Sequence, residues 1–319
     1  MNILEIYKAQ KRIRGWIRNT PVEYSSFLSD LCDSKVFLKL ENLQLTGSFK
    51  VRGAMNKLLQ LSQEERLRGV VTASSGNHAQ GVVYAANKLG IKATIVVPQN
   101  TPEIKLEAIR RHSVDLIVHG REYMDAERLA RKIETEQGMT FVSAYNDLDV
   151  IAGQGTVAIE LMEERPDLDA VLVPVGGGGL ISGVASFLKG VSNSVKVLGV
   201  QSEASPVMYE SLKSGHIVDM ELGESVAEGL HGGIEEGSIT FDYSRDLVDE
   251  IILVREDTIM DAIRLMIMKH HLIVEGAGAV GVAAILEAPK KFLNRNLGIV
   301  ISGGNLDERL LKRAVCVDD

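Results

Sequence analysis

One lysine stands in a setting that favours nucleophilic chemistry. Lys50 lies between Phe49 and Val51, just after a strand-like run and at the start of a helical pattern. Apolar neighbours at the end of an element keep water away from an amine, which disfavours the ammonium form and lowers its pKa. A neutral amine can attack a carbonyl carbon and form a Schiff base. On these residues alone a lysine with a solvated charge is the commoner case, so the interpretation depends on the rest of the chain.

Four consecutive glycines follow another strand-like run. The segment from Val173 to Gly183 contains a buried strand, a glycine-rich junction and a helix, and the junction consists of Gly176, Gly177, Gly178 and Gly179, followed by Leu180. Glycines let backbone N–H groups approach an anion, and a helix start adds partial positive charge. A flexible turn is the alternative, but ordering four glycines for a mere turn costs much backbone entropy. The run therefore predicts a phosphate site, and its spacing matches neither common nucleotide motif.

The stretch from Ala73 to Gly81 also joins a strand to a helix. The hydroxyl and N–H groups that could bind a carboxylate here, without a positive charge, belong to Ser74, Ser75, Gly76 and Asn77. An ordinary helix cap explains the same residues equally well. His78 lies inside the helix start, which favours a structural hydrogen bond over a role as a base.

Two further residues, Ser302 and Glu275, stand in settings that allow chemistry. Ser302 ends a strand and precedes two glycines, so its hydroxyl could bond a ring nitrogen, although a plain turn is the alternative. Glu275 has apolar neighbours, and buried glutamates are rarely without a partner. Pairing with a neighbouring N–H explains Glu275 as well as catalysis does. The adjacent His270 and His271 diverge by roughly 100° on a helix, so they cannot bind one metal together.

Strands that alternate with helices must position these residues. The predicted strands fall into two sets, residues 70–72, 93–97, 114–118 and 140–143, and residues 35–41, 170–175, 195–201, 251–254 and 297–301. This alternation predicts an α/β fold with two parallel sheets and the site in the cleft between them. We expect residues 49–147 to form a small α/β domain and residues 1–48 and 148–319 to form a large one. A helix is predicted over residues 2–16, and a long functional loop over residues 215–242.

Composition limits the class of protein. The chain has 319 residues, of which 45% are hydrophobic and 24% charged, enough for a large core and two domains. A net charge of −8 and a pI near 5.5 argue against nucleic acid as a partner. Cys32 and Cys316 lie far apart and predict neither a disulfide framework nor a metal site, which fits a cytoplasmic location. The longest uncharged apolar run, residues 276–286, is too short to span a bilayer, so no membrane partner is expected.

Several motifs together resemble one enzyme family. They are LENLQLTGSFKVRGA, TASSGNHAQGV, VIAGQGT, PVGGGGLISG, VEGAGAVGVAA and SGGN. In this order they are similar to the fold-type-II (tryptophan synthase β-like) pyridoxal phosphate enzymes, and more closely to the threonine/serine dehydratase and serine racemase group. The resemblance covers nearly the whole chain. It implies pyridoxal 5′-phosphate as cofactor and, for this group, a homo-oligomer such as a dimer or tetramer.

The resemblance also implies roles for particular residues. Lys50 would bind the cofactor as a Schiff base, with Phe49 beside the ring, Asn77 at the ring 3′-oxygen and Ser302 at the pyridine nitrogen. Residues 176–180 would bind the phosphate, and the loop from Ser74 to His78 would hold the substrate carboxylate. A neutral serine at the pyridine nitrogen weakens the ring as an electron sink, which favours early loss of a β-hydroxyl. The implied activity is β-elimination from serine or threonine, an amino-acid substrate, to a 2-oxo acid and ammonia, with Lys50 as the α-proton base.

Alternatives remain open at this point. Serine racemases carry a serine at the position of Ser75 as a second acid/base, so racemisation is an alternative activity. A 3-hydroxyaspartate is an alternative substrate, and a catalytically silent binding protein is an alternative of a different class. The racemase metal loop has acidic ligands where this chain has Gln201 and Val207, although Glu203 lies close by. A divalent cation is therefore an open expectation.

Overall fold

The larger of two β-sheets has six strands. The computed structural model describes residues 1–316, and the strand order of this sheet is β1-β2-β10-β7-β8-β9. Its strands are β1 (Val22–Tyr24), β2 (Lys35–Leu40), β7 (Ala170–Pro174), β8 (Lys196–Ser202), β9 (Glu250–Val254) and β10 (Asn296–Ile301). All neighbours pair in parallel except β1 and β2, which are antiparallel. The predicted parallel sheet is therefore confirmed, with one antiparallel edge strand of three residues, β1, that the sequence did not reveal.

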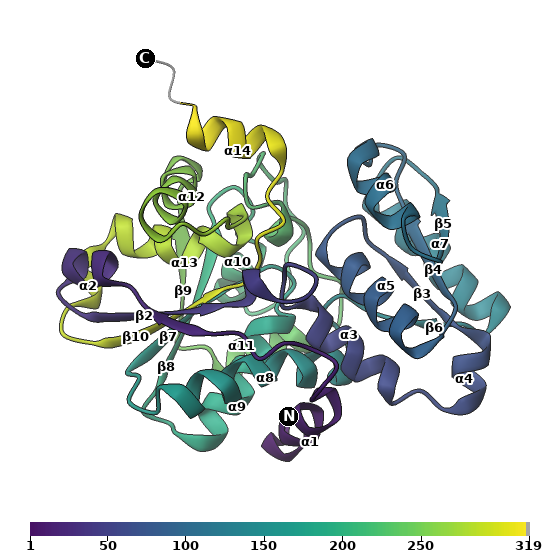
Figure 1. Cartoon of the computed structure of the whole chain (residues 1–319), viewed down its shortest axis with the longest axis horizontal. Coiled ribbons are helices and arrows are strands. Elements are labelled where there is room, and N and C mark those ends of the chain that lie inside the picture. The colour runs from purple at the N-terminus through teal and green to yellow at the C-terminus, as the bar shows by residue number, and fades with distance from the viewer. Residues whose placement is uncertain (317–319) are drawn as a thin grey trace.

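Helices cover both faces of this sheet (Figure 1). One face packs against α1 (Ile3–Ile13), α8 (Leu148–Glu164), α9 (Gly179–Val191), α10 (Val207–Ser214) and α11 (Ile239–Leu247). The other face packs against α2 (Ser26–Cys32), α12 (Glu256–His270), α13 (Gly276–Glu287) and α14 (Glu308–Val315). Strands buried on both faces account for the nearly continuous apolar runs in the sequence. The first helix is shorter than predicted, because the backbone leaves the helical conformation at Arg14 and Gly15 follows with φ +85°.

The smaller sheet has four parallel strands in the order β5-β4-β3-β6. Its elements are β3 (Val70–Ala73), β4 (Ala93–Val97), β5 (Asp115–Val118), β6 (Thr140–Phe141), α3 (Lys50–Leu59), α4 (Gln63–Arg68), α5 (Asn77–Leu89), α6 (Glu103–Arg110) and α7 (Tyr123–Gln137). Val70 and Ile95 pack on the α3 and α5 side, and Val71 and Val96 pack on the α7 side, as alternation along a strand requires.

The prediction that the strands between residues 70 and 143 form their own sheet is confirmed. Figure 1 shows this sheet and its helices beside the larger sheet. The exact domain limits, residues 1–48 and 148–319 against 49–147, stay a proposal, and residues 317–319 lie outside the described part of the chain.

The long segment between α10 and α11 is mostly irregular, as predicted for residues 215–242. Within this segment of the described residues, the one regular element is the 3-10 helix η2 (Glu228–Leu230). Because α11 begins at Ile239, the loop predicted to end at residue 242 extends a few residues too far. Two other short 3-10 helices are η1 (Glu41–Leu43) and η3 (Pro289–Phe292).

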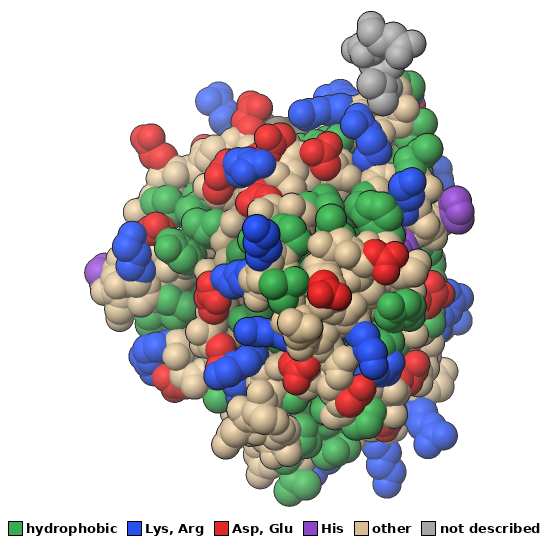
Figure 2. Space-filling view, turned by 90° about the vertical axis from the view of Figure 1, so that its left-hand side faces the viewer, with side chains coloured by type: hydrophobic (Ala, Val, Ile, Leu, Met, Phe, Trp, Pro, Cys, Tyr) green, Lys and Arg blue, Asp and Glu red, His purple; other side chains and the backbone are tan. Residues whose placement is uncertain are grey.

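The molecular surface carries mixed charge. On the face shown in Figure 2, basic and acidic side chains are interspersed and no large area has a single sign. Within residues 1–316, no helix combines the length and the apolar character that crossing a membrane requires. Cys32 is buried, Cys316 is exposed, and both are free thiols.

Candidate active site

The predicted site residues meet in one cavity at the carboxyl ends of strands from both sheets. Strand β3 leads into Ser74, β7 into Gly176 and β10 into Ser302, and all three residues line a cavity of about 1470 Å³. Crevices at the carboxyl ends of parallel strands are where open α/β sheets bind ligands. The full set of predicted residues lines this cavity: Phe49, Lys50, Ser74, Ser75, Gly76, Asn77, His78, Gly176, Gly177, Gly178, Gly179, Leu180 and Ser302.

Lys50 presents its amine to this cavity without a carboxylate partner. It is the first residue of α3, and Nζ donates to the backbone oxygen of Ala144 at 2.9 Å. Nζ also lies 5.3 Å from the centre of the Phe49 ring. Burial lowers the pKa of Lys50 from 10.5 to about 8, against the opposing charge of Glu275. Close to neutral pH the amine is therefore much nearer to its nucleophilic form than an ordinary lysine.

A buried ion network fixes the helix that carries Lys50. Arg52 is fully buried and donates to Glu41 and Glu160 through two nitrogens each, at 2.7–2.8 Å. Lys39 on β2 donates to the same Glu160 at 2.6 Å. Burial alone would lower the pKa of Arg52, but the two carboxylates raise it above its usual value. The network ties α3 to β2 and α8, and so holds Lys50 in place relative to the larger sheet.

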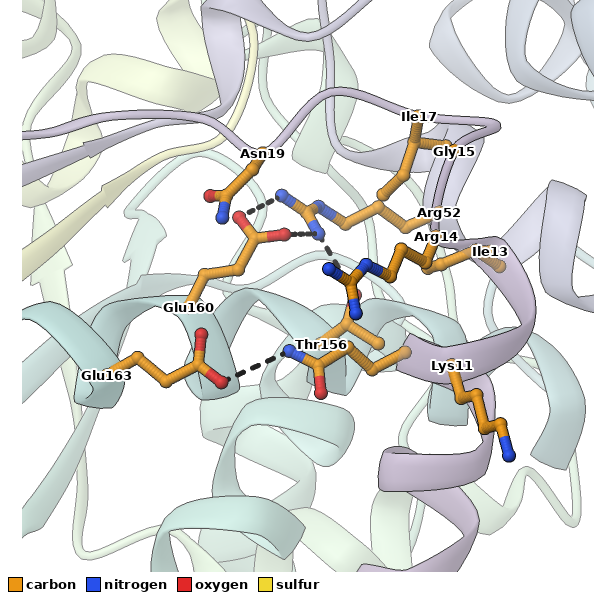
Figure 3. A pocket seen from close by; sticks show the side chains of 11 residues that line it. Lys11, Ile13, Arg14, Gly15, Ile17, Asn19, Arg52, Thr156, Glu160 and Glu163 are labelled. Atoms are coloured by element: carbon orange, nitrogen blue, oxygen red, sulfur yellow. Dashed lines mark hydrogen bonds and ion pairs between the residues drawn. The ribbon is translucent and has the colours of Figure 1, made fainter.

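Figure 3 shows the part of this network formed by Arg52 and Glu160, which lines a second cavity of about 550 Å³. The cavity lies between α1, α3 and α8, and its rim carries Lys11 and Arg14. Every nitrogen of the Arg52 guanidinium already has a protein acceptor. The Arg52 guanidinium therefore needs no ligand in this second cavity to complete its hydrogen bonds.

The four glycines form a backbone cradle at the start of α9. Gly178 has φ +88°, a left-handed conformation that L side chains rarely adopt, and no side chain caps the helix. The first N–H groups of α9 are thus left free for an anion. A Cβ added to Gly177 would lie 2.6 Å from the ring of Tyr145, and one on Gly179 would lie 2.8 Å from the Cα of Tyr145. Glycine is required here because Tyr145 packs directly against the cradle.

The loop before α5 carries polar groups with free bonding capacity. Ser74 Oγ accepts from the backbone N–H of Gly76 at 3.2 Å, whereas Ser75 makes no side-chain hydrogen bond to the described residues. His78 is buried, and its Nε2 lies 2.9 Å from the backbone oxygen of Val142. Because that acceptor is a carbonyl, Nε2 is the protonated nitrogen. Burial lowers the pKa of His78 to about 3, with Lys50 adding to the shift, so its predicted structural role agrees with its placement.

Asn77 belongs to a chain of hydrogen bonds at the same end of the cavity. Its Nδ2 donates to Glu275 at 2.7 Å, and its Oδ1 accepts from Nδ2 of Asn305 at 2.7 Å. Both ends of the Asn77 amide are therefore oriented by protein partners. Burial raises the pKa of Glu275 to about 7. Gly303 permits this arrangement, since a Cβ there would lie 2.3 Å from a carboxylate oxygen of Glu275.

Ser302 lies at the end of β10 and is almost fully buried. Its hydroxyl donates weakly to the backbone oxygen of Ala277, at 3.3 Å. A neutral hydroxyl in a long hydrogen bond can exchange this partner for a ligand atom. The placement agrees with the predicted contact to a ring nitrogen, which stays a proposal.

Sequence reasoning missed several residues that line the cavity. Tyr145 contacts the glycine cradle, and Glu127, Arg131 and Glu235 form part of the wall beyond it. Tyr145 follows the predicted strand that ends at residue 143, and its place after a strand could have marked it. Glu127 and Arg131 look like ordinary charges on an amphipathic helix, so their pattern offered no such signal.

The fold and the site define a class of protein. A lysine amine with a lowered pKa and a phosphate cradle share one cleft between two α/β regions, as in enzymes that hold an aldehyde cofactor through its phosphate. The family model described as "Pyridoxal-phosphate dependent enzyme" matches residues 13–303. The chain belongs to this family of pyridoxal-phosphate dependent enzymes, which confirms the predicted fold class and cofactor.

Known relatives agree with this assignment. The chain is 44% identical to an L-threonine ammonia-lyase of Thermotoga maritima over 311 residues, covering 98% of this chain and 77% of that protein. It is 40% identical to a catabolic L-threonine dehydratase of Escherichia coli, covering 95% of this chain and 92% of that protein. The structure matches maize serine racemase with a TM-score of 0.92 at 35% identity, covering 98% of this chain and 96% of the other.

The described residues fit pyridoxal phosphate. No side chain caps the first N–H groups of α9, which an anion requires, and Gly177 and Gly179 leave the space into which Tyr145 packs. Lys50 supplies an amine without a carboxylate partner, and Ser302 supplies a hydroxyl in a weak bond. These are the groups that an aldehyde, a phosphate and a pyridine nitrogen require.

The structure does not support a metal site in its described residues. Residues 1–316 contain no group of three or more His, Cys, Asp or Glu side chains that could hold an ion. Gln201, which stands at a predicted ligand position, instead accepts from the backbone N–H of Tyr209 at 2.8 Å. The described residues therefore give no support to the expectation of a divalent cation.

Proposed function

We propose that this protein is a threonine/serine ammonia-lyase that removes the β-hydroxyl and amino groups of a 3-hydroxy amino acid. The observation that carries the proposal is the amine of Lys50, which lines the same cavity as a glycine phosphate cradle and has a pKa lowered to about 8. The names of the Thermotoga maritima and Escherichia coli relatives support this activity. The products are a 2-oxo acid and ammonia.

The cofactor is held by groups that the chain supplies in fixed positions. Residues 176–180 would bind its phosphate through backbone N–H groups, Phe49 and Asn77 would contact the ring, and Ser302 would contact the ring nitrogen. Bound in this way, pyridoxal phosphate supplies an electron sink for the negative charge that develops at the substrate α-carbon. A neutral serine hydroxyl at the ring nitrogen keeps this sink weak.

Lys50 performs the proton transfer at the α-carbon. Its Nζ sits beside Ala144 at the cavity wall, and a free amine with a pKa of about 8 accepts a proton near neutral pH. The loop from Ser74 to His78 binds the substrate carboxylate through hydroxyl and N–H groups. This orientation exposes the α-hydrogen to Lys50, while neutral His78 supports the loop through Val142.

A panel of 3-hydroxy amino acids with chiral product analysis tests the proposal. We expect the purified holoenzyme to release 2-oxo acid and ammonia in equal amounts from L-threonine or L-serine. Absence of turnover across the whole panel, with cofactor bound, would favour a catalytically silent binding protein instead.

Racemisation is a second candidate activity, because Ser75 lines the cavity with an unbonded hydroxyl and the structure matches a serine racemase. If Ser75 returns a proton to the α-carbon, the holoenzyme will form D-serine from L-serine. Ser75→Ala should then abolish D-serine formation and leave elimination of L-serine largely intact. If Ser75→Ala loses racemisation and elimination to the same extent, Ser75 is not the residue that returns the proton.

We also propose a homo-oligomer, either a dimer or a tetramer, in the cytoplasm. The family resemblance supports the assembly, and two free cysteines support a reducing compartment. Sedimentation of the purified holoenzyme gives the number of subunits, and a mass equal to one chain would contradict the assembly.

A further inference from the structure

The cavity wall beyond Tyr145 carries three ionisable side chains that the proposed reaction does not use. Glu127 and Arg131 come from α7, and Glu235 comes from the segment between η2 and α11. Arg131 lies 3.8 Å from Glu127 and 3.6 Å from Glu235, and it also pairs with Glu134 at 3.5 Å, so one cation is shared among three carboxylates. We call Glu127, Arg131 and Glu235 the acidic wall.

The acidic wall and the reacting amine line the same cavity. Lys50 donates to the backbone oxygen of Ala144, and the next residue, Tyr145, accepts at its hydroxyl from the backbone N–H of Glu235 at 3.0 Å. The proposed carboxylate loop, residues 74–78, is a separate wall formed by the start of α5. A substrate with its amino group at Lys50 and its carboxylate on that loop leaves its side chain to the remaining walls of the cavity, one of which is the acidic wall.

No basic side chain of the described cavity is free to receive a second carboxylate. Besides Lys50, the basic lining residues are Lys105, Arg128 and Arg131. Lys105 pairs with Glu228 at 2.7 Å and Arg128 pairs with Asp125 at 2.5 Å. Arg131 also stacks on Phe141, with its guanidinium carbon 3.7 Å from the ring centre. The acidic lining residues are Glu122, Glu127, Asp219, Glu228, Glu235, Glu236, Glu275, Asp307 and Glu308.

From this arrangement we propose that the acidic wall determines substrate specificity, admitting 3-hydroxy amino acids with uncharged side chains and rejecting those with a second carboxylate. A negative side chain placed beside carboxylates that outnumber their shared cation is repelled, and no free cation of the described cavity compensates for its desolvation. The inference rests on the proposed function only in taking an amino acid bound at Lys50 as the ligand. It selects serine or threonine over a 3-hydroxyaspartate.

L-asparagine and L-aspartate isolate the effect of charge, because they have nearly the same shape and neither carries a β-hydroxyl. Titration calorimetry of the holoenzyme gives the dissociation constant of each. We expect asparagine to bind on the order of tenfold more tightly than aspartate, the change that 1.4 kcal/mol produces. The double variant Glu127→Gln/Glu235→Gln removes both carboxylates of the acidic wall and leaves Arg131 paired with Glu134, so aspartate should bind about tenfold more tightly than to the original protein, with asparagine nearly unchanged.

Glu136→Gln is the matched control. Glu136 lies on the same helix as Glu127, pairs with Lys132 at 3.7 Å and does not line the cavity, so its loss changes net charge as much as the single variant Glu127→Gln does but leaves the acidic wall intact. The control should retain the preference for asparagine. If the double variant does not fold, the single variant Glu127→Gln should show the same direction of change.

Equal binding of the two ligands by the original protein overturns the inference. So does a double variant that keeps the original preference, or a Glu136→Gln control that loses it. These outcomes are separate from the proposed function, because binding of asparagine and aspartate requires no elimination. A protein that prefers asparagine but releases no 2-oxo acid from serine or threonine contradicts the proposed function alone.

Discussion

Lys50 and Arg52 are two cations on the first turn of α3, and their surroundings are opposite. Arg52 is buried among Glu41 and Glu160 with every nitrogen bonded, whereas Lys50 reaches a large cavity and bonds only a backbone carbonyl. The carboxylates raise the pKa of Arg52, and burial lowers the pKa of Lys50 to about 8. The contrast indicates that a buried cation paired with carboxylates fixes the fold, whereas a buried amine with no paired carboxylate can act as a nucleophile or a base.

Removing the Lys50 amine tests the chemical side of this comparison. Lys50→Ala should lower release of 2-oxo acid from threonine on the order of 10⁴-fold or more, because both the base and the covalent contact to the cofactor are lost. The free energy of unfolding should stay close to that of the original protein, since no ion pair is broken. Turnover at a tenth of the original rate, measured in a steady-state assay, would refute the assigned role.

Removing the Arg52 guanidinium tests the structural side. Arg52→Met leaves Glu41 and Glu160 buried without their cation, and we expect a loss of about 3–5 kcal/mol in the free energy of unfolding. Guanidinium chloride unfolding of the holoenzyme measures this loss. Arg131→Met is the control, because Arg131 also pairs with carboxylates but is 42% exposed, and it should cost under about 1 kcal/mol. A similar loss of unfolding free energy in both variants would show that the buried ion network of Arg52 stabilises the fold no more than the exposed ion pairs of Arg131 do.

The glycine cradle offers a smaller perturbation within the cavity. Gly177→Ala places a Cβ 2.6 Å from the Tyr145 ring, and overpacking of about 1–3 kcal/mol should weaken cofactor binding by roughly ten- to a hundredfold. Gly233→Ala is the control, since Gly233 lines the same cavity and its added Cβ would meet nothing within 4 Å. Equilibrium dialysis gives both cofactor affinities. An unchanged affinity in Gly177→Ala would show that the cradle does not hold the phosphate.

Local sequence predicted much of the fold and of this site. Lys50, the four glycines and Ser302 each follow a strand-like run, and the carboxyl ends of parallel strands converge, so residues far apart in the chain line one cavity. Their roles toward the cofactor came from the family resemblance. Short-range sequence patterns were therefore enough to predict which residues lie at the ends of the strands and line the cavity.

Contacts between distant helices and loops were not predictable in the same way. The pairing of Arg131 with Glu235 joins an amphipathic helix to an irregular segment about a hundred residues later, and each side chain alone resembles an ordinary surface charge. The edge strand β1 was missed because three residues after a proline give almost no periodic signal. The burial of Arg52 likewise depends on Glu160, which only the packing of α8 against α3 reveals.

The central claim is that Lys50 is a nucleophile because its amine is buried and makes no ion pair with a carboxylate. The most direct test is the rate at which the apoenzyme binds pyridoxal phosphate covalently, followed by visible absorbance as a function of pH. Only the neutral amine attacks, so a lowered pKa shifts the rise in rate to lower pH, and we expect its midpoint near pH 8. A rate that keeps rising to a midpoint at the ordinary lysine value of 10.5 would contradict the account.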